Sequence, residues 1–139
     1  MIVGLGIDLV EIKRIRQALE RFGPRFVDKV LHASEADANF SSRHDILSAH
    51  SVARLAARFA AKEAGAKALG TGFTNGIWFR DIRILSLASG KPEVFFHGNA
   101  LARARELGVT HAHLSLTHAR DSAGAVVVLE SVQSISGTL

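Results

Sequence analysis

The feature that most constrains the fold is a long stretch of helical periodicity in the middle of the chain. From about Asp45 to Leu69, apolar residues recur at helical spacing, and Gly70 stands where such a helix would end. The segments on either side are short, rich in β-branched residues and not in regular alternation with helices. We therefore predict an α+β fold in which an antiparallel sheet packs against one long central helix.

The remaining elements follow from local patterns. Residues 2–10 are expected to form a strand in which Gly4 and Gly6 let another backbone approach closely. A helix is expected from Glu11 to Phe22, where Gly23 and Pro24 would end it. The other expected elements are a brief helix or loop at 34–42, strands at 77–79, 82–87, 93–96, 113–117 and 125–129, a turn at 89–90 and a third helix at 99–107.

Length and composition indicate one globular unit. With 139 residues the chain supports one hydrophobic core, so we expect a single domain over residues 1–139. Hydrophobic residues make up 47% and charged residues 22%, which is typical of soluble globular proteins. No apolar run approaches the roughly 20 residues that span a bilayer. Because Asp8 and Glu11 interrupt the N-terminal apolar stretch, no signal peptide is expected, and we predict a cytoplasmic protein.

Charge and cysteine content restrict the possible chemistry. The absence of cysteine excludes disulfides, thiolate metal sites and cysteine nucleophiles. A formal net charge of +4 favours an anionic partner, which leaves nucleic acid, a phosphorylated cofactor and an acidic protein as alternatives. Only 6% of the residues are aromatic and none is tyrosine, so stacking platforms for nucleic-acid bases are poorly supplied.

Two carboxylates stand at unusual positions. Helical spacing places Phe59, Glu63 and Lys67 on one face of the central helix, which we expect to be buried, so Glu63 would need a cation or hydrogen-bond donors. Asp8 interrupts an apolar strand and has no charge partner among its neighbours. Together the two acids could bind Mg²⁺, which takes one or two carboxylates and keeps water and phosphate ligands. The alternatives are an ordinary intrahelical pair between Glu63 and Lys67 and a helix cap made by Asp8.

Two turns could bind phosphate. The backbone N–H groups of Gly70, Thr71 and Gly72 could cradle it, but the signal is weak, and Gly70 alternatively only caps the helix. Lys91, in the turn before Pro92, is either solvated or a phosphate ligand.

The histidines allow two further interpretations. His111 and His113 have the spacing of two zinc ligands on a strand, but no third ligand stands at a suitable distance nearby. His118, at the strand end, could bind an anion or transfer a proton, or could be satisfied by the backbone.

Six motifs, in this order, resemble those of the short bacterial holo-acyl-carrier-protein synthases, the small class of phosphopantetheinyl transferases. The match covers nearly the whole chain. The motifs are Gly4-Leu-Gly-Ile-Asp8-Leu-Val-Glu11-Ile, Arg58-Phe-Ala-Ala-Lys62-Glu63-Ala with Lys67, Leu69-Gly-Thr-Gly72, Asp81-Ile, Gly90-Lys-Pro92 and Ser115-Leu-Thr-His118. The resemblance implies a phosphopantetheinyl transferase-like fold. It also implies Mg²⁺-dependent transfer of phosphopantetheine from coenzyme A to a serine of the apo acyl carrier protein of fatty-acid synthesis, with release of adenosine 3′,5′-bisphosphate.

The resemblance also implies roles for individual residues. Asp8 and Glu63 are the implied metal ligands, and the base for the carrier serine is expected to be Glu63 or a metal-held water first and Lys67 second. The implied coenzyme A contacts are Arg58, Lys62, Gly70, Thr71, Gly72, Lys91, Pro92, Thr117 and His118. The implied surface for docking an acidic helix of the carrier consists of Arg14, Arg21, Arg25 and Phe26, which could alternatively form a merely solvated basic face.

The resemblance to the short members of the family implies a homotrimer whose active sites lie between neighbouring subunits. The apolar strand 125–129 is compatible with burial at such a contact. The sequence departs from the family pattern at Ser122, where a tyrosine is common, at His32, where a threonine is common, and in the few basic residues of 41–50. These departures bear on nucleotide binding more than on the reaction. Two other functions stay open, namely a basic, non-catalytic module for nucleic acid or an acidic protein, and a histidine-bound zinc hydrolase.

Overall fold

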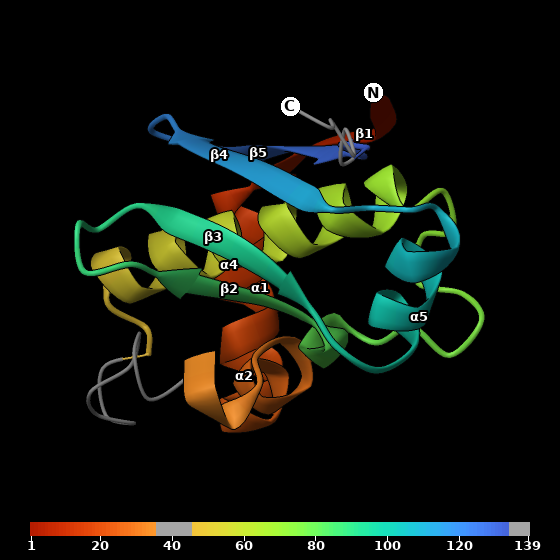
Figure 1. The fold of residues 1–139 in the computed structure, drawn as a ribbon. Coiled ribbons are helices and arrows are strands. Elements are labelled where there is room, and N and C mark those ends of the chain that lie inside the picture. Colours follow the sequence, from red (N-terminus) through yellow and green to blue (C-terminus); the bar gives the residue numbers. More distant parts are fainter. Residues whose placement is uncertain (36–45, 134–139) are drawn as a thin grey trace.

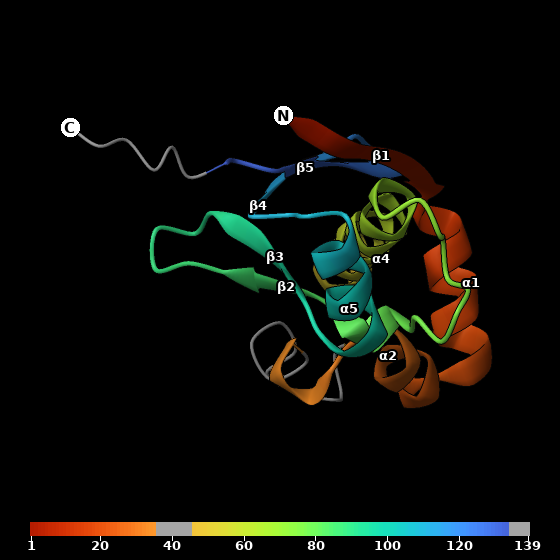
Figure 2. The ribbon, with the colours of Figure 1, turned by 45° about the vertical axis from the view of Figure 1, so that its right-hand side comes forward.

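The central helix predicted from the sequence is the axis of the fold. The computed structural model describes residues 1–35 and 46–133. Its elements are β1 (Ile2–Glu11), α1 (Ile12–Phe22), α2 (Pro24–Val30), α4 (Ala49–Ala68), the 3-10 helix η2 (Phe79–Asp81), β2 (Ile82–Ser86), β3 (Pro92–Phe96), α5 (Gly98–Glu106), β4 (His111–His118) and β5 (Ser122–Glu130). A three-stranded sheet of order β1-β5-β4 covers one side of α4, and the pair β2-β3 lies on another side (Figures 1 and 2).

All strand pairs in the described residues are antiparallel, and the α+β class is confirmed. The predicted sheet is divided in two, because β3 lies next to β4 without pairing with it. In the first sheet β5 is the central strand, with Ile7 opposite Val126 on one side and Ser115 opposite Val126 on the other. The apolar character of residues 125–129 is therefore explained within one chain, since Val127 and Leu129 are buried between the sheet and α4.

β1 packs directly on α4 because of its glycines. A Cβ atom added at Gly6 would lie 1.8 Å from the carbonyl oxygen of Ala64, and one at Gly4 would lie 2.2 Å from that of Ala68. The predicted close backbone approach is thus confirmed. Since side chains alternate along a strand, Asp8 shares the face of Gly4 and Gly6, which is turned toward the helix.

The ends of the helices show what local patterns capture and miss. α1 ends as predicted before Gly23, whose φ of 58° is in the left-handed region. Pro24, however, begins α2, a helix that the sequence analysis did not predict, because proline is also favoured in a first helical turn. α4 starts later than Asp45, since the Ser48 side chain accepts a hydrogen bond from the Ser51 N–H and caps the helix.

The segment between α4 and the second sheet corrects one prediction. Residues 77–79 do not form a strand; the Trp78 N–H donates to Asp81 Oδ2 at 3.0 Å and the chain turns into η2. The hairpin that follows is confirmed, with Ile82 opposite Phe96 and Gly90 at a φ of 87° in the turn. α5, β4 and β5 are also confirmed, with small shifts at their ends. The predicted helix or loop at 34–42 lies mostly outside the described residues, although residues 33–35 are helical.

The outer face of the first sheet is apolar and open. Leu5, Ile7 and Leu9 of β1 point away from α4 and are 64%, 70% and 72% exposed. In the part of the chain that the structure describes, no helix is both long and apolar enough to cross a membrane.

Candidate active site

A cavity of about 420 Å³ lies where β1, α1, α2 and α4 meet. It brings together all three residues that the sequence analysis placed in the reaction, Asp8, Glu63 and Lys67. The other lining residues are Leu9, Val10, Arg14, Ile15, Ala18, Phe26 and Phe59, so that one part of the wall is apolar and the other is charged.

Asp8 is held by Lys67. The Lys67 ammonium donates to Asp8 Oδ1 at 3.0 Å and to the Ile7 carbonyl oxygen at 3.1 Å. The Asp8 side chain is 17% exposed and that of Lys67 is 52% exposed. Asp8 does not cap α1, since Glu11 occupies the N-cap position and Asp8 lies three residues before it. The helix-cap alternative for Asp8 is therefore wrong.

Glu63 projects into the same cavity without being deeply buried. Phe59 and Glu63 are partly buried and Lys67 is exposed, so the prediction that this face of α4 is the buried one is wrong. Helical spacing correctly places the three residues on one face, but it does not say what covers that face. Within the described residues, the ion pair of Lys67 is with Asp8 rather than with Glu63.

The electrostatics of the two acids fit a hard divalent cation. Partial burial raises the pKa of Glu63, the Asp8 charge raises it further, and Lys67 opposes both effects. Carboxylates are oxygen donors of the kind that Mg²⁺ prefers, and a cation beside Glu63 and Asp8 would offset the repulsion that raises the pKa of Glu63. No group of three or more His, Asp or Glu side chains able to hold a metal occurs in the described ranges, so a cation here would take further ligands from water and substrate.

The predicted docking residues adjoin this cavity. Arg14 and Phe26 belong to its lining, and Phe26 packs toward Phe59 with a ring-centroid distance of 6.4 Å. Arg25 and Phe26 also line a neighbouring depression of about 360 Å³, and the Arg21 guanidinium lies 5.1 Å from the centroid of the Phe22 ring. The mixed basic and apolar surface on α1 and α2 is therefore continuous with the site.

A second cavity of about 270 Å³ collects part of the predicted coenzyme A contacts. Arg58, Thr117 and His118 line it, where α4 meets the end of β4. His50 and Arg54 line it as well and were missed. Their spacing of four residues along α4, continued by Arg58, was the available signal, because residues at this interval share a helix face. Burial and, next, the Arg54 charge lower the pKa of Arg58.

The glycine turn after α4 is placed elsewhere. Gly70 and Gly72 have φ values of 78° and 60°, and their N–H groups donate to the carbonyl oxygens of Lys67 and Ala66. These amides close the helix, as in the simpler alternative, and are not directed at a ligand. Thr71 lines a third cavity, of about 200 Å³, beside α5.

Lys91 and Pro92 line none of the cavities described above. Lys91 is exposed in the turn between β2 and β3, and its carbonyl oxygen accepts a hydrogen bond from the Leu87 N–H. Within one chain, the expected coenzyme A contacts therefore lie at separate places, namely the second cavity, the turn after α4 and the turn between β2 and β3.

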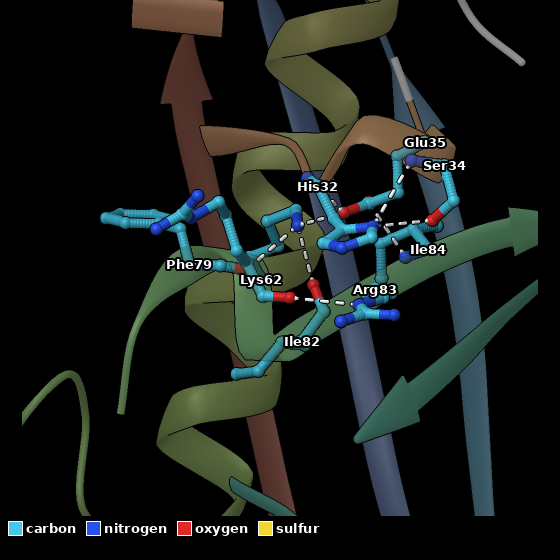
Figure 3. A network of polar contacts seen from close by, with 9 residues as sticks. His32, Ser34, Glu35, Lys62, Phe79, Ile82, Arg83 and Ile84 are labelled. Atoms are coloured by element: carbon cyan, nitrogen blue, oxygen red, sulfur yellow. Dashed lines mark hydrogen bonds and ion pairs between the residues drawn. The ribbon is translucent and has the colours of Figure 1, made fainter. Parts of the chain in front are cut away.

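Lys62 corrects a prediction. Its side chain is fully buried, and the ammonium donates to Glu35 Oε1 at 2.8 Å, the Phe79 carbonyl oxygen at 2.9 Å and the Ile82 carbonyl oxygen at 2.6 Å (Figure 3). Burial lowers its pKa to about 8, while Glu35 acts in the opposite direction. All three ammonium protons are engaged inside the protein, so Lys62 is not available to coenzyme A.

The histidine pair is not arranged as a zinc site in the described residues. His113 Nε2 is 3.1 Å from Glu130 Oε1, and His111 Nδ1 is 3.0 Å from Thr110 Oγ1. The two rings are thus engaged with different neighbours on the surface.

Comparisons with known proteins agree with the geometry. A family model described as the 4′-phosphopantetheinyl transferase superfamily matches residues 4–127. A holo-[acyl-carrier-protein] synthase of Maridesulfovibrio salexigens is 49% identical over 130 residues, which are 94% of this chain and 99% of the relative. The crystal structure of the Neisseria meningitidis holo-[acyl-carrier-protein] synthase superposes with a TM-score of 0.81 at 39% identity, over 94% of this chain and 100% of that one. The Bacillus anthracis enzyme in complex with CoA (3′,5′-ADP) superposes with a TM-score of 0.75 at 34% identity, over 95% and 99% of the two chains.

Proposed function

Because the chain belongs to the 4′-phosphopantetheinyl transferase superfamily, we propose that it transfers phosphopantetheine from coenzyme A to a serine of apo acyl carrier protein. This is the activity of a holo-[acyl-carrier-protein] synthase, and the carrier is expected to be that of fatty-acid synthesis in the cytoplasm. The observation that carries the proposal is the cavity in which Asp8 from β1 meets Glu63 and Lys67 from α4. These residues form a charged site beside the basic surface of α1 and α2.

Asp8 and Glu63 are the residues that would hold Mg²⁺. When bound, the ion would neutralise the diphosphate of coenzyme A and the charge that develops on the leaving phosphate. Lys67 holds Asp8 in place through its hydrogen bonds to Asp8 Oδ1 and the Ile7 carbonyl oxygen. Glu63 is the first candidate among the side chains for accepting the serine proton, because burial and Asp8 raise its pKa and so favour proton uptake.

The nucleotide part of coenzyme A is expected at the second cavity. Arg58, Thr117 and His118 are the residues carried over from the family pattern, and His50 and Arg54 add basic groups to the same wall. Guanidinium groups bind phosphate through paired hydrogen bonds, which suits a phosphorylated nucleotide. The released adenosine 3′,5′-bisphosphate would leave from here. Lys91, Pro92 and the turn of Gly70, Thr71 and Gly72 are proposed as contacts that a neighbouring copy supplies, the two glycines through the shape of the turn, because their amides close α4.

A homotrimer would bring such contacts together between subunits. The open face of the first sheet, with Leu5, Ile7 and Leu9 exposed, is the surface that supports this part of the proposal. Contiguous apolar side chains on a sheet face favour association with another copy of the chain. Carrier docking would use Arg14, Arg21, Arg25 and Phe26, since an acidic helix complements this basic surface.

A transfer assay tests the function. Apo carrier incubated with the protein, coenzyme A and Mg²⁺ should become heavier by one phosphopantetheine, as measured by mass spectrometry. Asp8→Ala should lower the rate by about 100-fold or more, because charge stabilisation in the site is lost. Asp121→Ala, the same change at an exposed position outside the cavity, is the control and should keep the rate. No mass change with the unaltered protein would reject the function, and full activity of Asp8→Ala would reject the metal-ligand assignment.

A further inference from the structure

Lys62 and Glu35 form a buried ion pair that the proposed reaction does not use. Both side chains have no exposed surface, and Lys62 is the largest fully buried side chain among the described residues. Glu35 Oε1 accepts from the His32 N–H at 3.0 Å as well as from Lys62, and Glu35 Oε2 accepts from the Ile84 N–H at 3.0 Å. Figure 3 shows these contacts converging from separate segments of the chain. A charged pair at such depth needs an explanation, since ion pairs of this kind are weak evidence for stability.

The surroundings of the pair indicate what it does. The buried positions of α4 near Lys62 are mostly small residues, namely Ala60, Ala61, Ala64, Gly65 and Ala66. The glycines of β1 lie against the Ala64 and Ala68 backbone on one side of the helix, but small side chains offer few interlocking contacts on the side of Lys62, so packing there constrains the rotation of the helix about its axis less than large side chains would. The hydrogen bonds of the Lys62 ammonium to Glu35, Phe79 and Ile82 are directional, so they restrict that rotation from the side of Lys62.

Rotation of α4 matters because Glu63 is the next residue. Successive residues project about 100° apart around a helix, so a fixed direction for Lys62 also fixes the direction of Glu63. Lys62 points toward η2 and β2, whereas Glu63 lines the cavity that contains Asp8. We infer that the buried Lys62–Glu35 pair is a positioning device that aims the Glu63 carboxylate at Asp8. The inference rests on the proposed function, in which these two acids hold Mg²⁺.

The test compares variants of the pair with a control in the same helix. Lys62→Met removes the ammonium and leaves the Glu35 carboxylate buried without it. Lys62→Met/Glu35→Gln also removes the buried carboxylate, so this double variant carries no buried charge from the pair and serves as the test if the single variant fails to fold. Val52→Ala is the control, because Val52 is fully buried in the first turn of α4, far along the helix from Glu63. Binding of Mg²⁺ alone is measured by calorimetry, and kcat and KM for transfer are measured below the melting temperature of every variant.

We expect both pair variants to bind Mg²⁺ about 10- to 100-fold more weakly and to lose kcat by a similar factor, as when a partner of a metal ligand is removed. The KM for the carrier should stay within about twofold, because the hydrogen bonds described for the pair go to the backbones of His32, Phe79, Ile82 and Ile84, none of which is a docking residue. Val52→Ala should lower only the melting temperature. Pair variants that also lose only melting temperature, with Mg²⁺ binding and kcat unchanged, would overturn the inference and leave the function intact. Unaltered protein that neither binds Mg²⁺ nor transfers would overturn the proposed function instead.

Discussion

Gly6→Ala should separate β1 from α4 and thereby damage both the fold and the site. The added methyl group would lie 1.8 Å from the Ala64 carbonyl oxygen and 2.7 Å from the Ala68 nitrogen. Lengthening the contact with the Ala64 oxygen from 1.8 Å to 3.0 Å requires a shift of about 1.2 Å, and both neighbours are backbone atoms that cannot rotate away. Overpacking costs about 1–3 kcal/mol, and the rigid contact places this variant at the upper end, at about 3 kcal/mol of unfolding free energy.

Urea denaturation followed by far-UV circular dichroism measures this loss. With a slope of about 1–3 kcal/mol per molar urea, the midpoint should fall by roughly 1–3 M at equal protomer concentration. Transfer activity should fall as well, because Asp8 lies on the same face of β1 and would move away from Lys67 and Glu63. Gly65→Ala is the matched control, since its methyl group would meet the Ile82 side chain at 3.1 Å and alanine favours a helix by about 1 kcal/mol.

The free energy of unfolding of the Gly65→Ala control should therefore differ by no more than about 1 kcal/mol from that of the unaltered protein. A Gly6→Ala variant with an unchanged midpoint would show that β1 does not lie against α4 as described.

Three further outcomes are expected. Arg14→Glu should raise the KM for the carrier by about tenfold through charge repulsion. Lys13→Glu makes the same type of change at the neighbouring residue, which lies outside the cavity, and should raise this KM less. Equal KM values for the two variants in steady-state kinetics would argue against docking at the cavity rim. Arg54→Ala should raise the KM for coenzyme A by about tenfold relative to Arg105→Ala on α5, and unchanged binding would remove the second cavity from the nucleotide site. Ile7→Glu should yield a folded monomer by light scattering, because Ile7 is 70% exposed in one chain; an unchanged oligomer would exclude the open sheet face as the contact.

The sequence predictions were accurate where the physical effect acts over only a few residues of the chain. Gly4 and Gly6 indicated a close backbone contact because the absence of a side chain is a local property, and the structure confirms it. The same holds for α1 and the central helix, whose periodicity and stop signals are contained in short segments. Pro24 was misjudged because one residue type serves two roles, ending one helix and beginning another.

The candidate site divides in the same way. Spacing placed Glu63 and Lys67 on one helix face, but it did not tell whether that face was covered, and the prediction of burial was wrong. It also did not reveal that Lys67 pairs with Asp8, because that contact joins residues far apart in the chain. Lys62, by contrast, is oriented inward by Glu35 and two carbonyl groups, none of which is a sequence neighbour.

The sequence by itself determined the helices and strands with the strongest periodicity, the glycine contact of β1, and the residue types that can hold a cation and bind phosphate. These depend on backbone preference and side-chain chemistry, which act over a few residues. Only the tertiary structure decided that Asp8 and Glu63 share one cavity, that Lys62 is internal, and that the phosphate-binding candidates lie in separate places. Burial and charge pairing depend on which distant segments meet, and the path of the chain sets those meetings.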